Sequence, residues 1–162
     1  MGFENFQKHC SECKKGKPCG KYHVYVMTVD PRIWESKRKA KFRKKNEVTY
    51  IQGMEMLYVG MSECTPRCRQ SKHHNYRSDG KGRWTCYCGN HGETNEYGGW
   101  WDKPSTVVKN YLKNGYGLLK PKLFKHLNPY LTKNDAEDAE KLLANELRSR
   151  GFGVWAGHHD VD

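Results

Sequence analysis

Long hydrophobic runs are absent from this chain of 162 residues. No window approaches the 18 or so apolar residues that a membrane-spanning helix needs. The first ten residues, MGFENFQKHC, also lack the hydrophobic stretch of a secretory signal peptide. These absences argue against both an integral membrane protein and an exported one. We therefore expect a cytoplasmic protein with no membrane partner.

Acidic residues are few compared with basic ones. Lysine and arginine total 29 against 18 aspartates and glutamates, which gives a formal net charge of +11. The excess is uneven, because residues 1–50 contain 13 basic and 5 acidic residues whereas residues 131–162 contain 4 and 7. This asymmetry favours a polyanionic partner on one face and a metal site or acidic pocket elsewhere.

The chain also lacks a full set of cysteine pairs, because its cysteines number seven. Without an export signal, an odd count is more typical of reduced thiols or metal ligands than of a disulfide framework. Cys10 and Cys13 form a C-x-x-C half-site, and a tetrahedral zinc could join them to Cys86 and Cys88. Free cysteines are the equal alternative. The remaining cysteines are Cys19, a substitute ligand, and Cys64 and Cys68, which we expect to be reduced thiols.

Apolar residues are sparse in residues 1–20, so this Cys- and Lys-rich segment cannot hold a core and is interpreted as an extension. Residues 21–162 are long enough for one domain with a single core. Within them, residues 77–104 break both helical and strand periodicity and are crowded with glycine, cysteine and tryptophan. We interpret them as an insertion, whose tryptophans would either stack on unpaired bases or form a small core of their own.

Alternating β-branched and aromatic residues predict strands at residues 23–29, HVYVMTV, and 55–61, EMLYVGM. Two strands joined by one excursion most simply pair antiparallel. Between them, Asp30 and Pro31 can open a basic helix or mobile arm, RIWESKRKAKFRKKN. Either form would present its cations to phosphates. These cations are Arg38, Lys39, Lys41, Arg43, Lys44 and Lys45.

Three further helices are expected from cap residues and spacing. Thr65 and Pro66 can begin the first, on which Arg69 and His73 are four residues apart and share a face. Residues 105–115 predict the second. The clearest spans residues 132–151, because acids crowd its first turns and a glycine closes it. Its inward stripe, with Glu140 beside it, is Ala136, Ala139, Leu143 and Leu147.

The last expected elements complete a small sheet. Residues 117–130 are predicted to be extended and then to turn at Asn128-Pro129, and GVWAG, residues 153–157, to form a final strand. We therefore expect an α+β fold in which a small central antiparallel sheet is flanked by helices, with a Cys-, Gly- and Trp-rich insertion.

Five side chains could together cut a phosphodiester, which requires proton transfer, a cation at the phosphate and support for the leaving oxygen. Tyr25 and Tyr58 supply phenols on adjacent strands. Arg69 supplies a guanidinium and His73 an imidazole, and Glu140 offers a carboxylate for Mg²⁺. Spacing in the sequence does not show whether the five converge.

The order of these residues resembles the GIY-YIG nuclease superfamily. HVYVM and LYVGMS stand where the two named tripeptides are expected, followed by Arg69, His73 and Glu140. The segments VYVMTVDPRIW, YVGMSECTP, HLNPY and AEKLLANELRSRGFGVWAGH further resemble small bacterial and phage GIY-YIG proteins, over most of residues 23–158.

The resemblance implies a role for each of the five. Tyr25 and Tyr58 would be the motif tyrosines, Arg69 would grip the scissile phosphate, and His73 would be the proton partner. Glu140 would bind a single divalent metal, Mg²⁺ or Mn²⁺. The activity implied is that of a Mg²⁺-dependent DNA endonuclease, in restriction, defence or mobile DNA.

Two positions have rivals. The first motif reads His23-Val24-Tyr25 without the family's glycine, so Tyr22, in GKY, is the alternative tyrosine, although strand alternation favours Tyr25. Glu137, one turn before Glu140, is the alternative carboxylate.

The expected partner is double-stranded DNA, plain, modified or branched. Because one site cuts one strand at a time, a double-strand break would need two copies, as in a homodimer, or two successive cuts. Two other hypotheses compete with the nuclease: a non-catalytic, zinc-stabilised nucleic-acid-binding module, and a zinc-dependent protein-interaction domain with an incidental basic surface.

Overall fold

The structure is a computed structural model that describes residues 22–62, 66–75, 82–85, 94–97, 107–157 and 159–160. The extension, residues 1–20, lies outside the described residues. The strands are β1 (His23–Val29), β2 (Met56–Ser62), β3 (Gly82–Thr85), β4 (Thr94–Tyr97) and β5 (Gly153–Ala156). The α-helices are α2 (Ala40–Asn46), α3 (Pro66–Asn75) and α4 (Lys133–Ser149), and the 3-10 helices are η1 (Pro31–Glu35), η2 (Lys37–Lys39), η4 (Lys109–Tyr111) and η5 (Pro121–Leu123).

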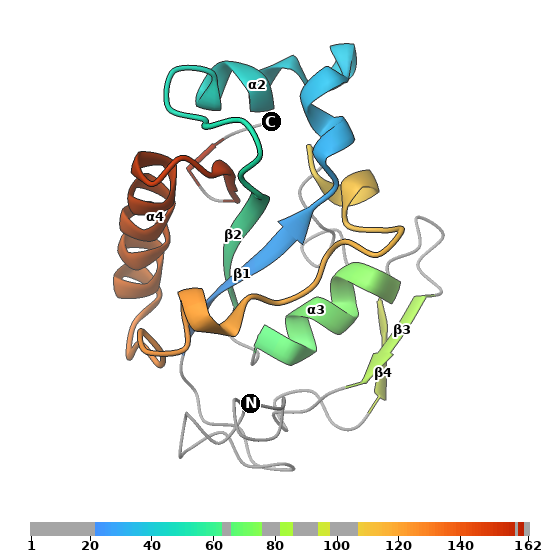
Figure 1. The fold of residues 1–162 in the computed structure, drawn as a ribbon. Helices are drawn as coiled ribbons and strands as arrows, with labels where there is room; N and C mark the ends of the chain where they lie inside the picture. Colours follow the sequence, from blue (N-terminus) through green and yellow to red (C-terminus); the bar gives the residue numbers. More distant parts are fainter. Residues whose placement is uncertain are drawn as a thin grey trace.

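The central sheet has three strands in the order β1-β2-β5 (Figure 1). β1 pairs antiparallel with β2, as the sequence predicts, but β5 pairs parallel with β2. The expectation of an antiparallel sheet is therefore wrong for the third strand, and the sheet is mixed. The reason lies in the connection, because α4 carries the chain back along the sheet before β5 begins, and such a crossover returns a strand in the parallel sense.

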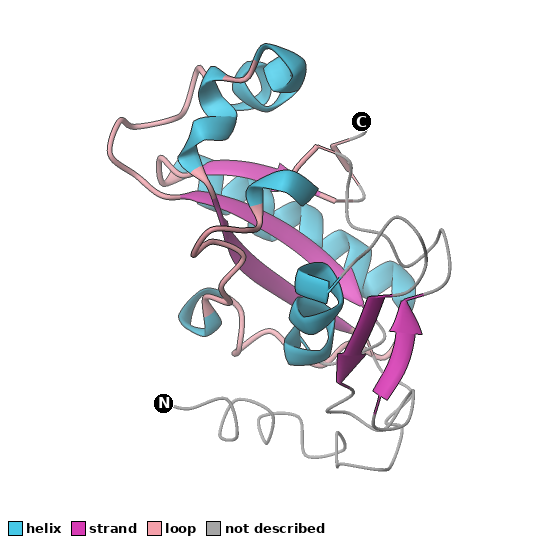
Figure 2. Ribbon diagram, turned by 90° about the vertical axis from the view of Figure 1, so that its right-hand side faces the viewer, coloured by secondary structure: helices cyan, strands magenta, loops and turns pink. Residues whose placement is uncertain are grey.

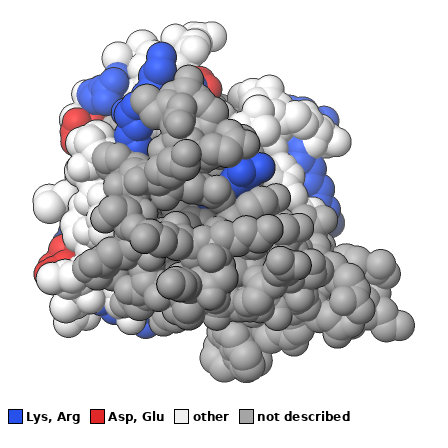
Figure 3. Space-filling model, turned by 90° about the horizontal axis from the view of Figure 1, so that it is seen from below, with Lys and Arg blue, Asp and Glu red and all other residues white. Residues whose placement is uncertain are grey.

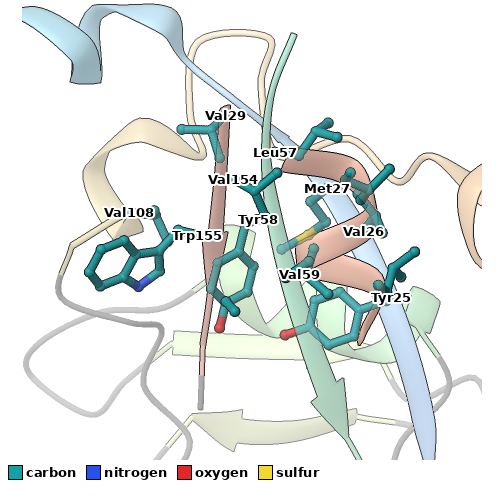
Figure 4. Packing of buried hydrophobic residues seen from close by; sticks show 14 of the residues in the cluster. Tyr25, Val26, Met27, Val29, Leu57, Tyr58, Val59, Val108, Val154 and Trp155 are labelled. Carbon is teal, nitrogen blue, oxygen red and sulfur yellow. The ribbon is translucent and has the colours of Figure 1, made fainter. Parts of the chain in front are cut away.

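Helices cover both sides of this sheet. Figures 1 and 2 show α4 along one side and α3 on the other. The register places Tyr25, Tyr58 and Trp155 on one face, because Tyr58 is directly opposite Trp155 and one diagonal step from Tyr25. Figure 4 shows these rings projecting from the same side of the strands. The α+β class is thus confirmed.

The described segments agree closely with several local predictions. Asp30 caps η1, with its carboxylate accepting a hydrogen bond from the Arg32 backbone N–H at 3.0 Å. The basic stretch is helical, as η1, η2 and α2. Thr132 caps α4 by accepting from the Asp135 N–H at 3.1 Å. The inward stripe of α4 is confirmed: Ala136, Leu143 and Leu147 are buried, and Ala139 is partly buried against them.

The helix predicted at residues 105–115 is wrong. Its described part is a turn followed by the single 3-10 turn η4, although Val108 and Leu112 are buried. The chain then reverses through Asn114 and Gly115, whose φ angles of 57° and 89° are left-handed. Apolar spacing identified residues that reach the core but not their backbone conformation, and the left-handed pair turns the chain where the helix was expected to end.

The segment after this reversal was predicted to be extended, and it is so only as far as Lys120, along the outer edge of β1, before η5 and further turns follow. Gly117 N–H donates to the Thr28 carbonyl at 2.8 Å and Lys120 N–H donates to the Val26 carbonyl at 2.9 Å. The predicted turn follows at Asn128-Pro129, whose peptide bond is cis. In the described part of the insertion, β3 and β4 form a separate antiparallel pair that packs near α3.

Asparagine side chains close both edges of the central sheet. At the β1 edge, Asn128 accepts from the Val24 N–H and donates to the Val24 carbonyl, both at 2.7 Å. At the β5 edge, Asn46 of α2 accepts from the Val154 N–H at 2.8 Å and donates to its carbonyl at 3.0 Å. Each amide therefore satisfies both backbone groups of one edge residue, as a neighbouring strand would.

The described helices include none that combines the length and the apolar composition needed to cross a lipid bilayer.

Candidate active site

Tyr25, Tyr58 and His73 form a buried cluster between the sheet and α3. The Tyr25 hydroxyl oxygen lies 3.0 Å from Nε2 of His73. The Tyr58 ring centroid lies 6.0 Å from that of Tyr25 and 5.5 Å from that of His73. Tyr25, Tyr58 and His73 are 1%, 5% and 4% exposed. Three of the five predicted site residues, from two strands and a helix, thus contact one another.

Two glycines make room for the tyrosines. Gly60 is directly opposite Tyr25 in the sheet, and a Cβ atom there would stand 2.6 Å from Tyr25 Cζ. Gly157, just beyond β5, lies two residues after Trp155, which is the direct partner of Tyr58, and a Cβ atom there would stand 3.1 Å from Tyr58 Cζ. Both rings therefore approach a glycine on the neighbouring segment, and a side chain at either glycine would displace the ring that lies over it.

Burial dominates the electrostatics of the tyrosines. It raises the pKa of Tyr25, while the charge of Arg69 and its hydrogen bonding to Tyr25 act in the opposite direction. Burial also raises the pKa of Tyr58 well above its usual value, and the neighbouring Tyr25 adds to this rise. Both phenols are therefore protonated at neutral pH.

Arg69 and Glu140 act on the same two tyrosines. The positive charge of Arg69 lowers the pKa of both, and the negative charge of Glu140 raises both. Glu140 is 0% exposed, which is unusual for a carboxylate on a helix with a solvated face. All five predicted site residues are thus in contact or in electrostatic interaction with the tyrosine cluster.

The structure also distinguishes the two rival positions. Tyr22 lies three residues before Tyr25, so strand alternation directs it to the opposite face, and its backbone pairs with Tyr130. Glu137 is partly exposed and lies 3.9 Å from the ammonium of Lys133. Neither shares the burial and contacts of Tyr25 and Glu140.

The residues available for a divalent metal are few. Within the described ranges, no group of three or more His, Cys, Asp or Glu side chains could hold a metal ion. Mg²⁺ is nevertheless commonly held by one or two carboxylates, with water and substrate phosphate completing its shell. The Glu140 carboxylate is a hard-oxygen donor of this kind and its charge acts on both tyrosines, so Glu140 could serve as a single protein ligand for Mg²⁺ or Mn²⁺. The predicted zinc ligands Cys10, Cys13, Cys86 and Cys88 lie outside the described residues, as do Cys19 and Cys64.

The predicted nucleic-acid-binding cations lie at the other end of the sheet. Phe42 and Asn46 anchor α2 against Gly153 and Val154, at the start of β5. Tyr25 lies four residues along β1 from Val29, which is at the α2 end, a separation of about 13 Å. Arg38, Lys41, Arg43, Lys44 and Lys45 are exposed and Lys39 is partly exposed.

Cations are not confined to α2. Viewed from below, the coloured surface in Figure 3 includes Lys and Arg side chains on both its left and its right sides. A polyanion could therefore meet positive charge at more than one place.

Sequence reasoning missed Trp155, Gly157 and Asn128. Trp155 is fully buried beside Tyr58, and Asn128 fixes Val24 next to Tyr25. The segments GVWAG and HLNPY contain these residues, but nothing in their spacing indicates which strand they would meet.

No family model, curated protein or solved structure matches this chain.

Proposed function

We propose that this protein is a Mg²⁺-dependent DNA endonuclease of the GIY-YIG type. The observation that carries the proposal is the Tyr25 hydroxyl hydrogen-bonded to His73, with Tyr58 against both. Purely structural tyrosines in a sheet usually pack against apolar neighbours. Here two buried phenols meet an imidazole and interact with a guanidinium and a carboxylate, which is the inventory that phosphodiester hydrolysis needs.

Proton transfer in this site runs through Tyr25 to His73. Because burial keeps the phenols protonated, the tyrosinate form is too scarce at neutral pH to act as a general base without help. With its proton on Nδ1, His73 accepts the Tyr25 hydroxyl proton at Nε2 while Tyr25 takes a proton from the attacking water. The positive charge then rests on imidazole, and no phenolate accumulates.

The bond changes follow from that transfer. The water oxygen forms a bond to phosphorus, the bond to the 3′ oxygen breaks, and the leaving oxygen takes a proton from solvent. Arg69 binds the phosphate oxygens, whose charge grows in the transition state. Glu140 would hold Mg²⁺ or Mn²⁺, which when bound supplies Lewis-acid stabilisation of the phosphate and the leaving oxygen.

The α2 cations would hold the DNA backbone without reading its sequence. Because they lie about 13 Å or more from Tyr25, the duplex would run along the length of the sheet to meet both. Cutting both strands would require a homodimer or two successive events.

The test is cleavage of supercoiled plasmid and of modified and branched DNAs, with Mg²⁺, with Mn²⁺ and with chelator. Glu140→Gln keeps the shape of the buried side chain but removes its charge, and His73→Ala removes the proton acceptor. We expect each to reduce cleavage by at least about a thousandfold. Glu146→Gln, at an exposed position on the same helix, is the matched control and should cut normally.

Three outcomes would contradict the proposal in different ways. Full activity of Glu140→Gln together with loss in Glu137→Gln would move the metal to the rival carboxylate. Metal-independent cutting would remove the metal from the reaction. Tight, salt-dependent DNA binding without cutting of any substrate would instead establish the non-catalytic binding module.

A further inference from the structure

A pocket of about 330 Å³ lies at the end of the sheet away from the Tyr25 cluster. It opens where β1 ends and β2 begins, and its lining includes Val29, Tyr50, Met54, Glu55, Met56 and Tyr116. None of the five candidate active-site residues lines it. Its volume is at the lower end of the range for small-molecule sites, which suits one planar ring system.

The walls of this pocket are suited to a flat aromatic ligand. Two tyrosines and two methionines contribute polarisable surface, and both residue types pack well on aromatic rings. The Tyr50 wall is fixed in place, because its ring centroid lies 4.8 Å from that of Trp34 and its hydroxyl donates to the Met54 carbonyl at 2.9 Å. A ring entering the pocket therefore meets a surface that needs no rearrangement.

One side chain in the lining gives the pocket chemical selectivity. The Glu55 carboxylate is an acceptor without a proton to donate, and it is 47% exposed. Lys120 lies 2.9 Å from one carboxylate oxygen and holds the group in place, which leaves the other oxygen for a ligand. An amino group on the edge of a ring would donate to it, whereas a ring carbonyl at that position would be repelled.

Cations follow the Pro31 wall of the pocket along the chain, and the first of them, Arg32, is paired with Asp30. Arg32, beside the lining residue Pro31, is held by Asp30 through hydrogen bonds of 2.9 Å and 2.6 Å. The exposed cations of η2 and α2 follow a few residues later. A ligand whose ring enters the pocket while a phosphate remains outside would match this distribution of charge.

We propose that this pocket binds a nucleobase that carries an exocyclic amino group, such as adenine or cytosine. The base reaches it either as a free nucleoside or as a base extruded from a DNA strand. The second source rests on the proposed function, whereas the first does not. An extruded base would stack on the pocket's aromatic rings while the α2 cations hold the flanking phosphates.

The first experiment measures nucleoside binding to the full chain by saturation-transfer NMR, with adenosine, cytidine and thymidine as probes. We expect adenosine and cytidine to bind at least about fivefold tighter than thymidine. Tyr116→Ala should abolish binding. Glu55→Gln should bind the three nucleosides with similar affinities, because an amide both donates and accepts hydrogen bonds. Glu47→Gln, exposed at the end of α2, is the control and should keep the preference.

The second experiment compares duplexes that carry a single bulged adenine or a single bulged thymine. The wild type should bind the adenine bulge about tenfold tighter, and Glu55→Gln should bind both alike. Discrimination among free nucleosides alone would identify a nucleoside as the occupant. Discrimination in the duplexes alone would identify an extruded base.

The inference and the proposed function can fail separately. The pocket assignment is overturned if the protein does not discriminate amino bases from thymine, either as free nucleosides or as bulged bases. It is also overturned if this discrimination persists in folded Tyr116→Ala and Glu55→Gln. Neither result depends on the cleavage assay. Amino-base binding by a protein that cuts no DNA keeps the pocket and overturns the nuclease. Thermal denaturation of Tyr116→Ala verifies its fold, and Glu55→Gln supplies a second variant with little change in shape.

Discussion

The two ends of the central sheet solve different physical problems with different residues. At one end Tyr25, Tyr58 and His73 are buried and touch one another. At the other end the cations of α2 are exposed, and only Phe42 and Asn46 of that helix are buried. Proton transfer needs groups held in fixed geometry away from water, whereas binding a polyanion needs charges that stay solvated and adjustable. Under the proposed function, one sheet would supply both because its ends are covered differently.

Among the variants that test this contrast between the two ends, Gly60→Ala should have the largest effect. The added Cβ would collide with the Tyr25 ring, so the ring must leave the position in which its hydroxyl meets His73. A displacement of about 1 Å in a catalytic group costs on the order of a hundredfold in rate. The measurement is the cleavage rate at saturating DNA, beside thermal denaturation to verify folding.

Gly157→Ala sharpens this prediction, because it crowds Tyr58 instead. If Tyr25 relays the proton, Gly60→Ala should lose more activity than Gly157→Ala. A folded Gly60→Ala protein with a normal rate would show that the position of Tyr25 does not matter. Under the proposed function DNA affinity would depend on the other end of the sheet, so it should change little in either variant.

The next prediction compares the two asparagines that close the sheet edges. Asn128→Ala leaves both the Val24 N–H and the Val24 carbonyl without this partner, which costs about 2–3 kcal/mol of unfolding free energy. Asn46→Ala deprives the Val154 N–H of its partner and should cost about 1–2 kcal/mol, because Arg148 still donates to the Val154 carbonyl at 2.9 Å. The functional effects should differ. Asn128→Ala loosens Val24, beside Tyr25, and should lower the cleavage rate, whereas Asn46→Ala loosens α2 and should weaken DNA binding.

Chemical denaturation and cleavage kinetics on the same two proteins provide the test. Equal losses of cleavage rate and of DNA affinity in both variants would mean that the two ends of the sheet are mechanically coupled and do not act separately.

Local sequence signals were sufficient for elements whose residues interact with near neighbours. Asp30 with Pro31 and Thr132 identified the starts of η1 and α4, since a cap depends on residues two or three positions away. Alternation in HVYVMTV gave β1 its observed bounds. The direction of β5 and the 3-10 conformation of η4 were not predictable in this way, because they depend on α4 as a crossover and on left-handed Asn114.

The candidate site was predictable from the sequence to about the same extent as the fold. The residue types and their order predicted the candidate site residues Tyr25, Tyr58, Arg69, His73 and Glu140. Only the register reveals that Gly60 and Gly157 lie under the two tyrosines, because each contact joins residues on different strands. The sequence composition predicted the cations of α2, but their distance from Tyr25 could be known only from the fold.

A third prediction concerns the exposed cations of α2. Lys41, Arg43 and Lys44 would be replaced together by glutamine; Lys45 is left because it lies 3.5 Å from Asp160. Each lost phosphate contact should reduce the slope of log affinity against log salt by up to about 0.9. We expect about a tenfold loss of DNA affinity at moderate salt with an unchanged rate at saturating DNA, measured by fluorescence anisotropy and cleavage.

The matched control replaces Lys122 and Lys141, which are exposed on η5 and α4. An equal loss in the control would show that total charge, not the α2 surface, governs binding.

The smallest effect on stability should appear at alkaline pH and should arise from Tyr25 and Tyr58, at one end of the sheet. Burial raises the pKa of Tyr58 and of Tyr25 in the folded chain, so the folded protein holds these protons more tightly than the unfolded one. Stability from this source is complete below the ordinary tyrosine value of about 10 and is lost as pH rises from there through the folded pKa. Tyr58, whose pKa is raised further, should cost up to about 1.4 kcal/mol of unfolding free energy at pH 11 relative to pH 9, and Tyr25 should cost less. Denaturant titrations at the two pH values should show a smaller loss of unfolding free energy in Tyr58→Phe than in the wild type.

Tyr116→Phe is the control, because Tyr116 lies at the opposite end of the sheet and is partly exposed, and it should behave as the wild type does. An equal alkaline loss in all three proteins would mean that the buried phenols do not set the pH response, and the contrast between the two ends would then rest on position and exposure alone.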